Sequence, residues 1–172
     1  MELQSRTEFP ALLDHLGFQR ACEVGIWKDA FSAHLLQHSH LATLVSVDSW
    51  HDSFPHAPIT ASRLEAQARR ALAPFGSRSR ILIDYSPQAA QQFADGYFDF
   101  VYIDANHRYH LIQADIAAWW PKVRAGGILA GHDYVRARHC GVIQAVDEFV
   151  AAHKCELHLT STDRFPSWWV SK

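Results

Sequence analysis

The chain has 172 residues, of which 48% are hydrophobic, so it is long enough to form one domain with a sizeable core. A formal net charge of −2 gives no electrostatic reason to expect nucleic acid or an anionic membrane as a partner. The N-terminus does not resemble a signal peptide, no apolar run approaches the ~18 residues of a membrane span, and the three cysteines lack C-x-x-C spacing. We therefore expect a single domain over residues 1–172 in the cytoplasm.

The first half of the chain alternates helical and strand-like patterns, which is typical of a parallel sheet with crossover helices. The pattern predicts, in chain order, a helix over 7–16, a strand over 20–24, a turn over 25–28, a helix over 29–37, a strand over 41–47, a loop or lid over 51–62, a helix over 63–75, a strand over 79–83 and a short helix over 88–93.

The stretch 97–134 organises the rest of the chain. A buried strand over 98–103 ends at Asp104, a helix follows and ends near Pro121, and Gly126-Gly127 turns the chain into a second strand over 128–130 that ends at His132-Asp133. Ligands of parallel sheets bind at the carboxyl ends of the strands. We therefore expect Asp104 and Asp133 to lie side by side, with His107 and His132 next to them.

The C-terminal part predicts a helix over 142–153 and two strands over 156–161 and 167–171. Their short connection suits an antiparallel hairpin at the sheet edge. The pairs Trp119-Trp120 and Trp168-Trp169 should be core on one side, and exposed partners could form a homodimer contact along this hairpin.

Two acids at successive strand ends suggest a nucleotide-containing ligand. Glu23 and Asp48 are 25 residues apart, close to the ~20-residue offset between a glycine turn and a ribose-binding acid. A nicotinamide-dependent oxidoreductase is one interpretation of this spacing. The chain lacks G-x-G-x-x-G, however, and is short for an added substrate domain.

Three phrases of the sequence, at 23–32, 98–109 and 126–134, resemble those of class I S-adenosylmethionine-dependent methyltransferases, and most closely of small O-methyltransferase-like proteins. The resemblance implies an α/β fold, with a doubly wound, mostly parallel seven-stranded sheet (Rossmann-like), helices on both faces and a C-terminal antiparallel hairpin. The family usually has a second glycine where this chain has Asp29, whose carboxylate could crowd the amino-acid end of the cofactor or bond its ammonium.

The resemblance also implies which residues bind S-adenosylmethionine. Glu23 and Gly25 would approach the methionine part, with Trp27 in the same turn, and Asp48 would accept the ribose hydroxyls. The other implied contacts are Ser49 and Trp50 flanking the adenine, Ser86 at the adenine edge, and Asp104 closing the pocket.

The reactive rim comprises Asp104, His107, His132 and Asp133. In relatives that methylate hydroxyls, oxygen ligands here bind Mg²⁺, and Asp104 and Asp133 match such positions. His132 stands where another acid or amide is common, which points to a weak Mg²⁺ site, a softer metal such as Mn²⁺ or Zn²⁺, or no metal. Without a metal, His107 or His132 could be the general base.

The resemblance implies methyl transfer to a hydroxyl oxygen. We expect the acceptor to be a small molecule, because only the loops at 51–62 and 135–141 are available to shape the pocket. A protein that binds S-adenosylmethionine without catalysis, such as a sensor, is the alternative.

Overall fold

The computed structural model describes residues 2–27, 30–50 and 60–172. Asp29 and most of the loop expected over 51–62 lie outside the described residues.

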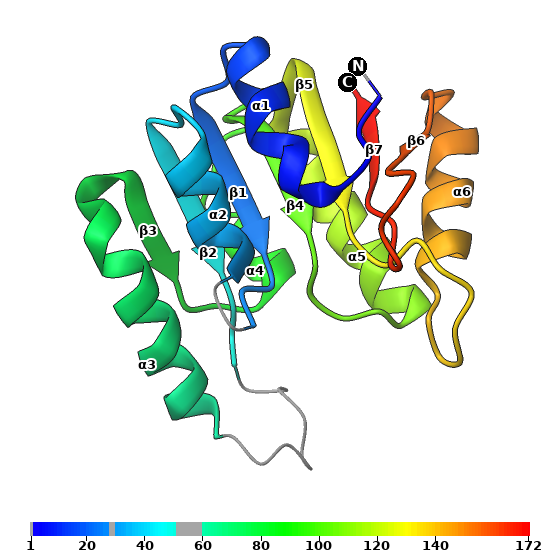
Figure 1. Cartoon of the computed structure of the whole chain (residues 1–172). Helices are drawn as coiled ribbons and strands as arrows, with labels where there is room; N and C mark the ends of the chain where they lie inside the picture. The colour runs from blue at the N-terminus through cyan, green and yellow to red at the C-terminus, as the bar shows by residue number, and fades with distance from the viewer. Residues whose placement is uncertain (1, 28–29, 51–59) are drawn as a thin grey trace.

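The strands form one seven-stranded sheet in the order β3-β2-β1-β4-β5-β7-β6 (Figure 1). The first five are parallel, β7 is antiparallel to β5, and β6 is antiparallel to β7, so the predicted mostly parallel sheet with a C-terminal hairpin is confirmed. The strands are β1 (Arg20–Val24), β2 (Thr43–Val47), β3 (Ser79–Leu82), β4 (Phe98–Ile103), β5 (Val123–Gly131), β6 (His158–Leu159) and β7 (Trp168–Ser171).

Helices cover both faces of this sheet, with α1 and α2 on one face and α4, α5 and α6 on the other (Figure 1). The α-helices are α1 (Phe9–His15), α2 (Ala30–His38), α3 (Ala61–Leu72), α4 (Ser86–Ala90), α5 (Tyr109–Trp119) and α6 (Val142–His153), and the 3-10 helices are η1 (Arg6–Glu8), η2 (Ala73–Arg78) and η3 (Trp120–Lys122).

All six residues of strand β4 are buried, and the side chains of its C-terminal part point alternately into two hydrophobic clusters, one on each face of the sheet. Phe100 and Tyr102 pack with α1 and α2, whereas Val101 and Ile103 pack with α5 and α6. Strand β7 also contributes to both clusters, with Trp168 in the one that contains α5 and α6 and Trp169 in the one that contains α1 and α2, and both tryptophans are buried. The homodimer contact expected along this hairpin stays a prediction, but neither of these indoles is exposed to form it.

The glycine pair of the organising stretch is not a turn before β5, which corrects the prediction. Gly126 and Gly127 lie within the strand, where an irregularity separates the pairing of Phe98 with Val123 from that of Phe100 with Ile128. Gly126 has φ +73°, a left-handed conformation that glycine adopts without a steric penalty. The extra residues form a bulge, so the strand begins earlier than its apolar run.

Other boundaries differ by a few residues. Helix α4 begins at Ser86 rather than at 88, because Pro87 is favourable in the first turn of a helix. Strand β6 contains only two residues of the six expected.

The register of the central strands positions the site. Val24 pairs with both Val47 and Ile103, and Ile103 pairs with Gly131, so β1, β2, β4 and β5 end at one edge. We call this edge the carboxyl rim. Among the described residues, no helix has the length and apolar character needed to cross a membrane.

Candidate active site

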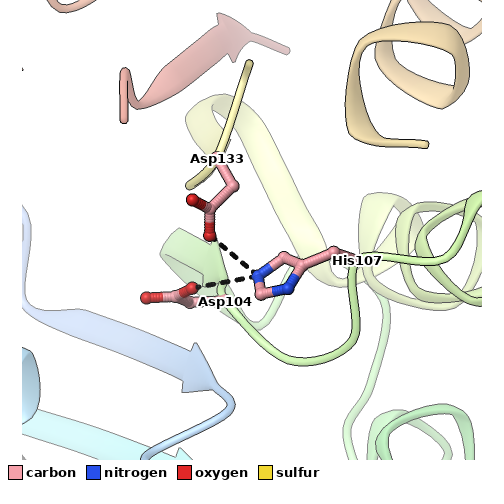
Figure 2. Close-up of side chains that lie close together, drawn as sticks. All are labelled: Asp104, His107 and Asp133. Carbon is pink, nitrogen blue, oxygen red and sulfur yellow. Dashed lines mark ion pairs between the residues drawn. The ribbon is translucent and has the colours of Figure 1, made fainter. Parts of the chain in front are cut away.

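Asp104, His107 and Asp133 converge at the carboxyl rim, as the strand-end argument predicts (Figure 2). His107 Nε2 lies 2.8 Å from Asp133 Oδ2 and 3.8 Å from Asp104 Oδ1. Asp104 directly follows β4, Asp133 is the second residue after β5, and His107 comes from the connection between β4 and α5. The two aspartates are half-buried and the imidazole is more accessible.

His132 joins the same group from the side of β5. Its Nδ1 lies 3.2 Å from Asp133 Oδ2 and 3.7 Å from Asp104 Oδ1. One oxygen of Asp133 is thus shared between two imidazoles. The four side chains named as the reactive rim are all brought together.

Charge compensation controls the protonation of this group. The carboxylates of Asp104 and Asp133 raise the pKa of His107 to about 10, against the opposing effect of burial. Burial acts to raise the pKa of Asp133, but hydrogen bonding to His107 and His132 and the nearby positive charge outweigh it and hold this pKa well below its ordinary value. At neutral pH His107 is therefore a cation between two carboxylates.

The donor set fits a small divalent cation. One ligand atom from each of Asp104, His107 and Asp133 lies within 4.8 Å of the others. Two carboxylate oxygens with one imidazole nitrogen form a mixed set, which suits Mn²⁺ or Zn²⁺ better than Mg²⁺. The imidazole in this set belongs to His107. His132, the ligand expected from the sequence, faces the same two carboxylates through Nδ1, and its role as a ligand stays a prediction.

Asp48 connects the glycine turn after β1 to the end of β2. Its Oδ2 accepts hydrogen bonds from the backbone N–H groups of Ile26 (3.0 Å) and Trp27 (3.3 Å), and its Oδ1 accepts one from Trp50 N–H at 2.8 Å. A carboxylate has about four acceptor positions, so capacity remains for ligand hydroxyls. Trp27 is 39% exposed and Ser49 is half-buried at this place.

Gly25 brings this turn against the reactive group. Its φ of +95° is left-handed, and a Cβ here would collide with the backbone carbonyl of Asp104. The Asp104 N–H also donates to Val24 O at 2.7 Å. The half of the rim that carries Asp48 therefore adjoins the half that carries Asp104.

Three non-glycine residues of the rim have left-handed backbones. They are Trp27 (φ +50°) after β1, Trp50 (φ +49°) after β2 and Asp133 (φ +57°) after β5. Such strain is uncommon and gathers at ligand-binding sites. Its presence at the ends of three strands supports a functional role for this edge.

Glu23 lies in β1, two residues before Gly25, and is almost fully buried. Ser32, from the first turn of α2, donates a hydrogen bond to Glu23 Oε2, and the Ser32 and Ser46 hydroxyls are 2.7 Å apart. Burial raises the pKa of Glu23 to about 8.

Two of the residues expected at the adenine have side chains committed to packing. Trp50 is 3% exposed in a small cluster with Ile26, Leu64 and Ala68. The Ser86 hydroxyl accepts a hydrogen bond from Trp119 Nε1 at 2.9 Å. Their contacts with a cofactor stay predictions.

Sequence reasoning missed Arg6, whose Nη1 donates to Asp104 Oδ2 at 3.2 Å. A local signal was present, since Ser5 and Glu8 form a capping box that fixes the turn containing Arg6. Nothing in that signal shows that the turn lies beside a residue 98 positions away.

Comparisons with solved structures give the same fold at low identity. An O-methyltransferase from Bacillus cereus in complex with SAH (S-adenosylhomocysteine) superposes with a TM-score of 0.72 and 17% identity, covering 96% of this chain and 80% of that one. The SAH-bound methyltransferase PaMTH1 from Podospora anserina gives 0.70 and 14%, covering 99% and 79%. A spermidine synthase from Thermotoga maritima gives 0.64 and 12%, covering 97% and 59%, so the fold alone does not define the reaction.

A search of curated proteins gives no match. The family comparison decides the matter, because the model described as "Methyltransferase domain" matches residues 22–134, more than half of the chain and all of the reactive rim. The chain therefore belongs to the methyltransferase-domain family, with the class I fold of S-adenosylmethionine-dependent methyltransferases.

Proposed function

We propose that the protein transfers the methyl group of S-adenosylmethionine to a hydroxyl oxygen of a small molecule. The observation that carries this proposal is the contact between the glycine turn and Asp104. This contact places the half of the rim expected to bind the nucleoside, with Glu23 and Asp48, next to the half that carries the aspartates and histidines of the reactive rim. A ligand bound across the first half would present its reactive end to the second.

When bound, S-adenosylmethionine supplies an electrophilic methyl group on a sulfonium, so the protein needs mainly to align the two reactants. Asp48 and Glu23 would bind the ribose and the amino-acid end. Trp27 lies in the glycine turn and Ser49 directly follows Asp48. Trp50 would support the adenine end from the packed interior, and Ser86 would do so from a half-buried position beside Trp119. This assignment favours a methyltransferase over a nicotinamide-dependent oxidoreductase, in agreement with the family.

The rim histidines would handle the proton of the acceptor hydroxyl. His107 is cationic at neutral pH, and because its Nε2 is buried against the two carboxylates, it would bind the acceptor oxygen by donating from Nδ1. In His132, Nδ1 faces Asp133, so Nε2 would accept the proton of the hydroxyl. A general-base role for His107 would require loss of its proton, and the rate would then rise with pH toward about 10.

As an alternative to the role of His107 as a hydrogen-bond donor, a divalent cation would be held by Asp104, His107 and Asp133 in place of the His107 proton, and its chemistry would be to lower the pKa of the acceptor hydroxyl. The mixed donor set favours Mn²⁺ or Zn²⁺ over Mg²⁺ in this proposal.

The first experiment is isothermal titration with SAH, with and without Mg²⁺ or Mn²⁺, on the wild type and the Asp48→Ala variant. We expect micromolar binding that the variant loses. Asp95→Asn is the matched control, because Asp95 is an exposed carboxylate paired with Lys122 at the opposite end of β4. Absence of SAH binding in the wild type would contradict the proposal.

The second experiment measures methyl transfer to a panel of small hydroxyl compounds. Tight SAH binding with no turnover on any acceptor would favour the non-catalytic alternative. Transfer only to a protein or an RNA would contradict the small-molecule acceptor.

A further inference from the structure

Arg6 is bound to three separate parts of the molecule. Its Nη1 donates to Asp104 Oδ2 at 3.2 Å, its guanidinium carbon lies 4.7 Å from the centre of the Phe31 ring on α2, and its backbone N–H donates to Asp163 Oδ2 at 2.7 Å. The side chain is 26% exposed. A half-buried guanidinium with these contacts has a defined position.

The segment that carries Arg6 is held on both sides. Gln4 O accepts hydrogen bonds from the N–H and the hydroxyl of Thr162, each at 2.9 Å, in the loop between β6 and β7. On the other side, His34 Nε2 of α2 lies 2.9 Å from Thr7 O. Figure 1 shows the N-terminal segment running alongside β7 before α1 begins. The two ends of the chain thus support the arginine together.

The two oxygens of Asp104 face different groups. Oδ2 is bound to Arg6, whereas Oδ1 lies 3.8 Å from His107 Nε2 and 3.7 Å from His132 Nδ1. A charge-assisted hydrogen bond to one oxygen restricts rotation of the carboxylate. The direction of the other oxygen is then fixed as well.

We infer that Arg6 is a positioning residue of the reactive rim: it holds Asp104 Oδ2, so that Asp104 Oδ1 stays turned toward His107 and His132. This inference rests on the proposed methyl transfer for its kinetic consequence, but not for its geometry. It also extends the site beyond the family match at 22–134, because Arg6 lies outside that range.

The first test separates the rate from cofactor binding in three variants. Arg6→Met keeps an apolar side chain of similar length and removes the donors together with the cation over Phe31, so we expect kcat to fall ~10–100-fold, the usual effect of losing a group that orients a functional residue. SAH affinity should fall by less than kcat does, because the hydrogen bond that is removed goes to Asp104 and not to Asp48, although Arg6 also has a charge–charge interaction with Glu23. Arg6→Lys can donate to the same oxygen and should recover most of kcat.

Asp163→Asn is the control for simple loss of the N-terminal anchor. It weakens the hydrogen bond to the backbone of Arg6 and leaves the guanidinium in place, so it should lower the melting temperature with kcat within ~3-fold of wild type. An unchanged kcat in Arg6→Met, or an equal loss of kcat in Asp163→Asn, would overturn the inference.

A crystal structure of the Arg6→Met variant tests the geometry without any activity. We expect the Asp104 carboxylate to turn away from His107 and His132. An unchanged Asp104 would overturn the inference even if the wild type proved to be active. If the wild type transfers methyl to no acceptor, the proposed function fails by itself, and this crystallographic result still decides the role of Arg6.

Discussion

The two halves of the carboxyl rim hold their carboxylates in different ways. On the β1–β2 half, Asp48 accepts hydrogen bonds from backbone N–H groups and Glu23 accepts one from a hydroxyl. On the β4–β5 half, the carboxylates of Asp104 and Asp133 face charged or chargeable side chains. The first half is built from neutral donors and the second from ions.

This difference separates binding from chemistry. The backbone donors around Asp48 are fixed by the fold and do not change with pH over the ordinary range, so they suit a cofactor that must bind in one orientation. In the same half, Glu23 has a carboxyl group whose pKa is raised into that range. Imidazole and guanidinium groups around carboxylates create a site whose charge responds to a proton, a metal or a substrate. Both halves meet at Gly25, so changes there should affect them together.

The largest effect should come from Gly25→Ala. The new Cβ would be in a left-handed backbone and would collide with Asp104 O, so we expect a loss of about 3–4 kcal/mol in the free energy of unfolding and loss of SAH binding. Gly17→Ala is the matched control, because Gly17 has φ +67° with nothing within 4 Å of a Cβ, and it should cost only about 1 kcal/mol. Urea denaturation measures both. Equal losses would show that the contact between the halves is not tight.

The second prediction uses pH to separate the halves. The folded pKa of Glu23 is raised from 4.5 to about 8, so stability should fall as pH rises through that window, with a slope of up to about 1.4 kcal/mol per pH unit. The folded pKa of His107 is raised from 6.5 to about 10, so its contribution is complete below 6.5 and is lost as pH rises toward 10. Both groups lower stability with rising pH, but in different windows.

Urea denaturation between pH 5 and pH 10 should therefore show a flatter profile below pH 8 for Glu23→Gln and a flatter profile above pH 6.5 for His107→Gln. A Glu23→Gln profile that matches wild type would contradict a buried, protonated Glu23.

The third prediction removes the carboxylate that the two imidazoles share. In Asp133→Asn we expect the pKa of His107 to fall by roughly 1–3 units, because loss of an opposite charge at this range has that effect. NMR titration of the His107 ring measures it, with Asp95→Asn as the control that should leave it unchanged. A constant pKa would mean that the ion pair does not form in solution.

The sequence predicted the frame of the site well. Strands β1 and β4 and helix α6 begin and end where the patterns place them, because buried apolar runs and a clear helical period leave few alternatives. Asp104 and Asp133 could be paired in advance because parallel strands end at a common edge.

What the sequence could not show is where a side chain points once a helix packs beside it. Trp50 and Ser86 follow strand ends, as ligand-binding residues do, yet their side chains turn into the packing beneath α3 and α5. Arg6 is the opposite case, because a turn far from the motifs delivers a side chain into the rim. Both outcomes depend on tertiary packing, which local patterns do not encode.

The smallest expected effect is a difference in affinity between Mn²⁺ and Mg²⁺ at the β4–β5 half of the rim. It tests whether an imidazole nitrogen binds the metal there in addition to carboxylate oxygens. Mn²⁺ accepts imidazole more readily than Mg²⁺ does, so Asp104, His107 and Asp133 should bind Mn²⁺ about 10-fold more tightly, or about 1.4 kcal/mol. Isothermal titration with each metal measures this on protein treated with a chelator. His107→Gln supplies an oxygen in place of the imidazole and should remove most of the preference. If that variant kept the full preference for Mn²⁺, the imidazole of His107 would not be a ligand, and His132 Nδ1, which faces the same two carboxylates, would be the nitrogen donor to test next.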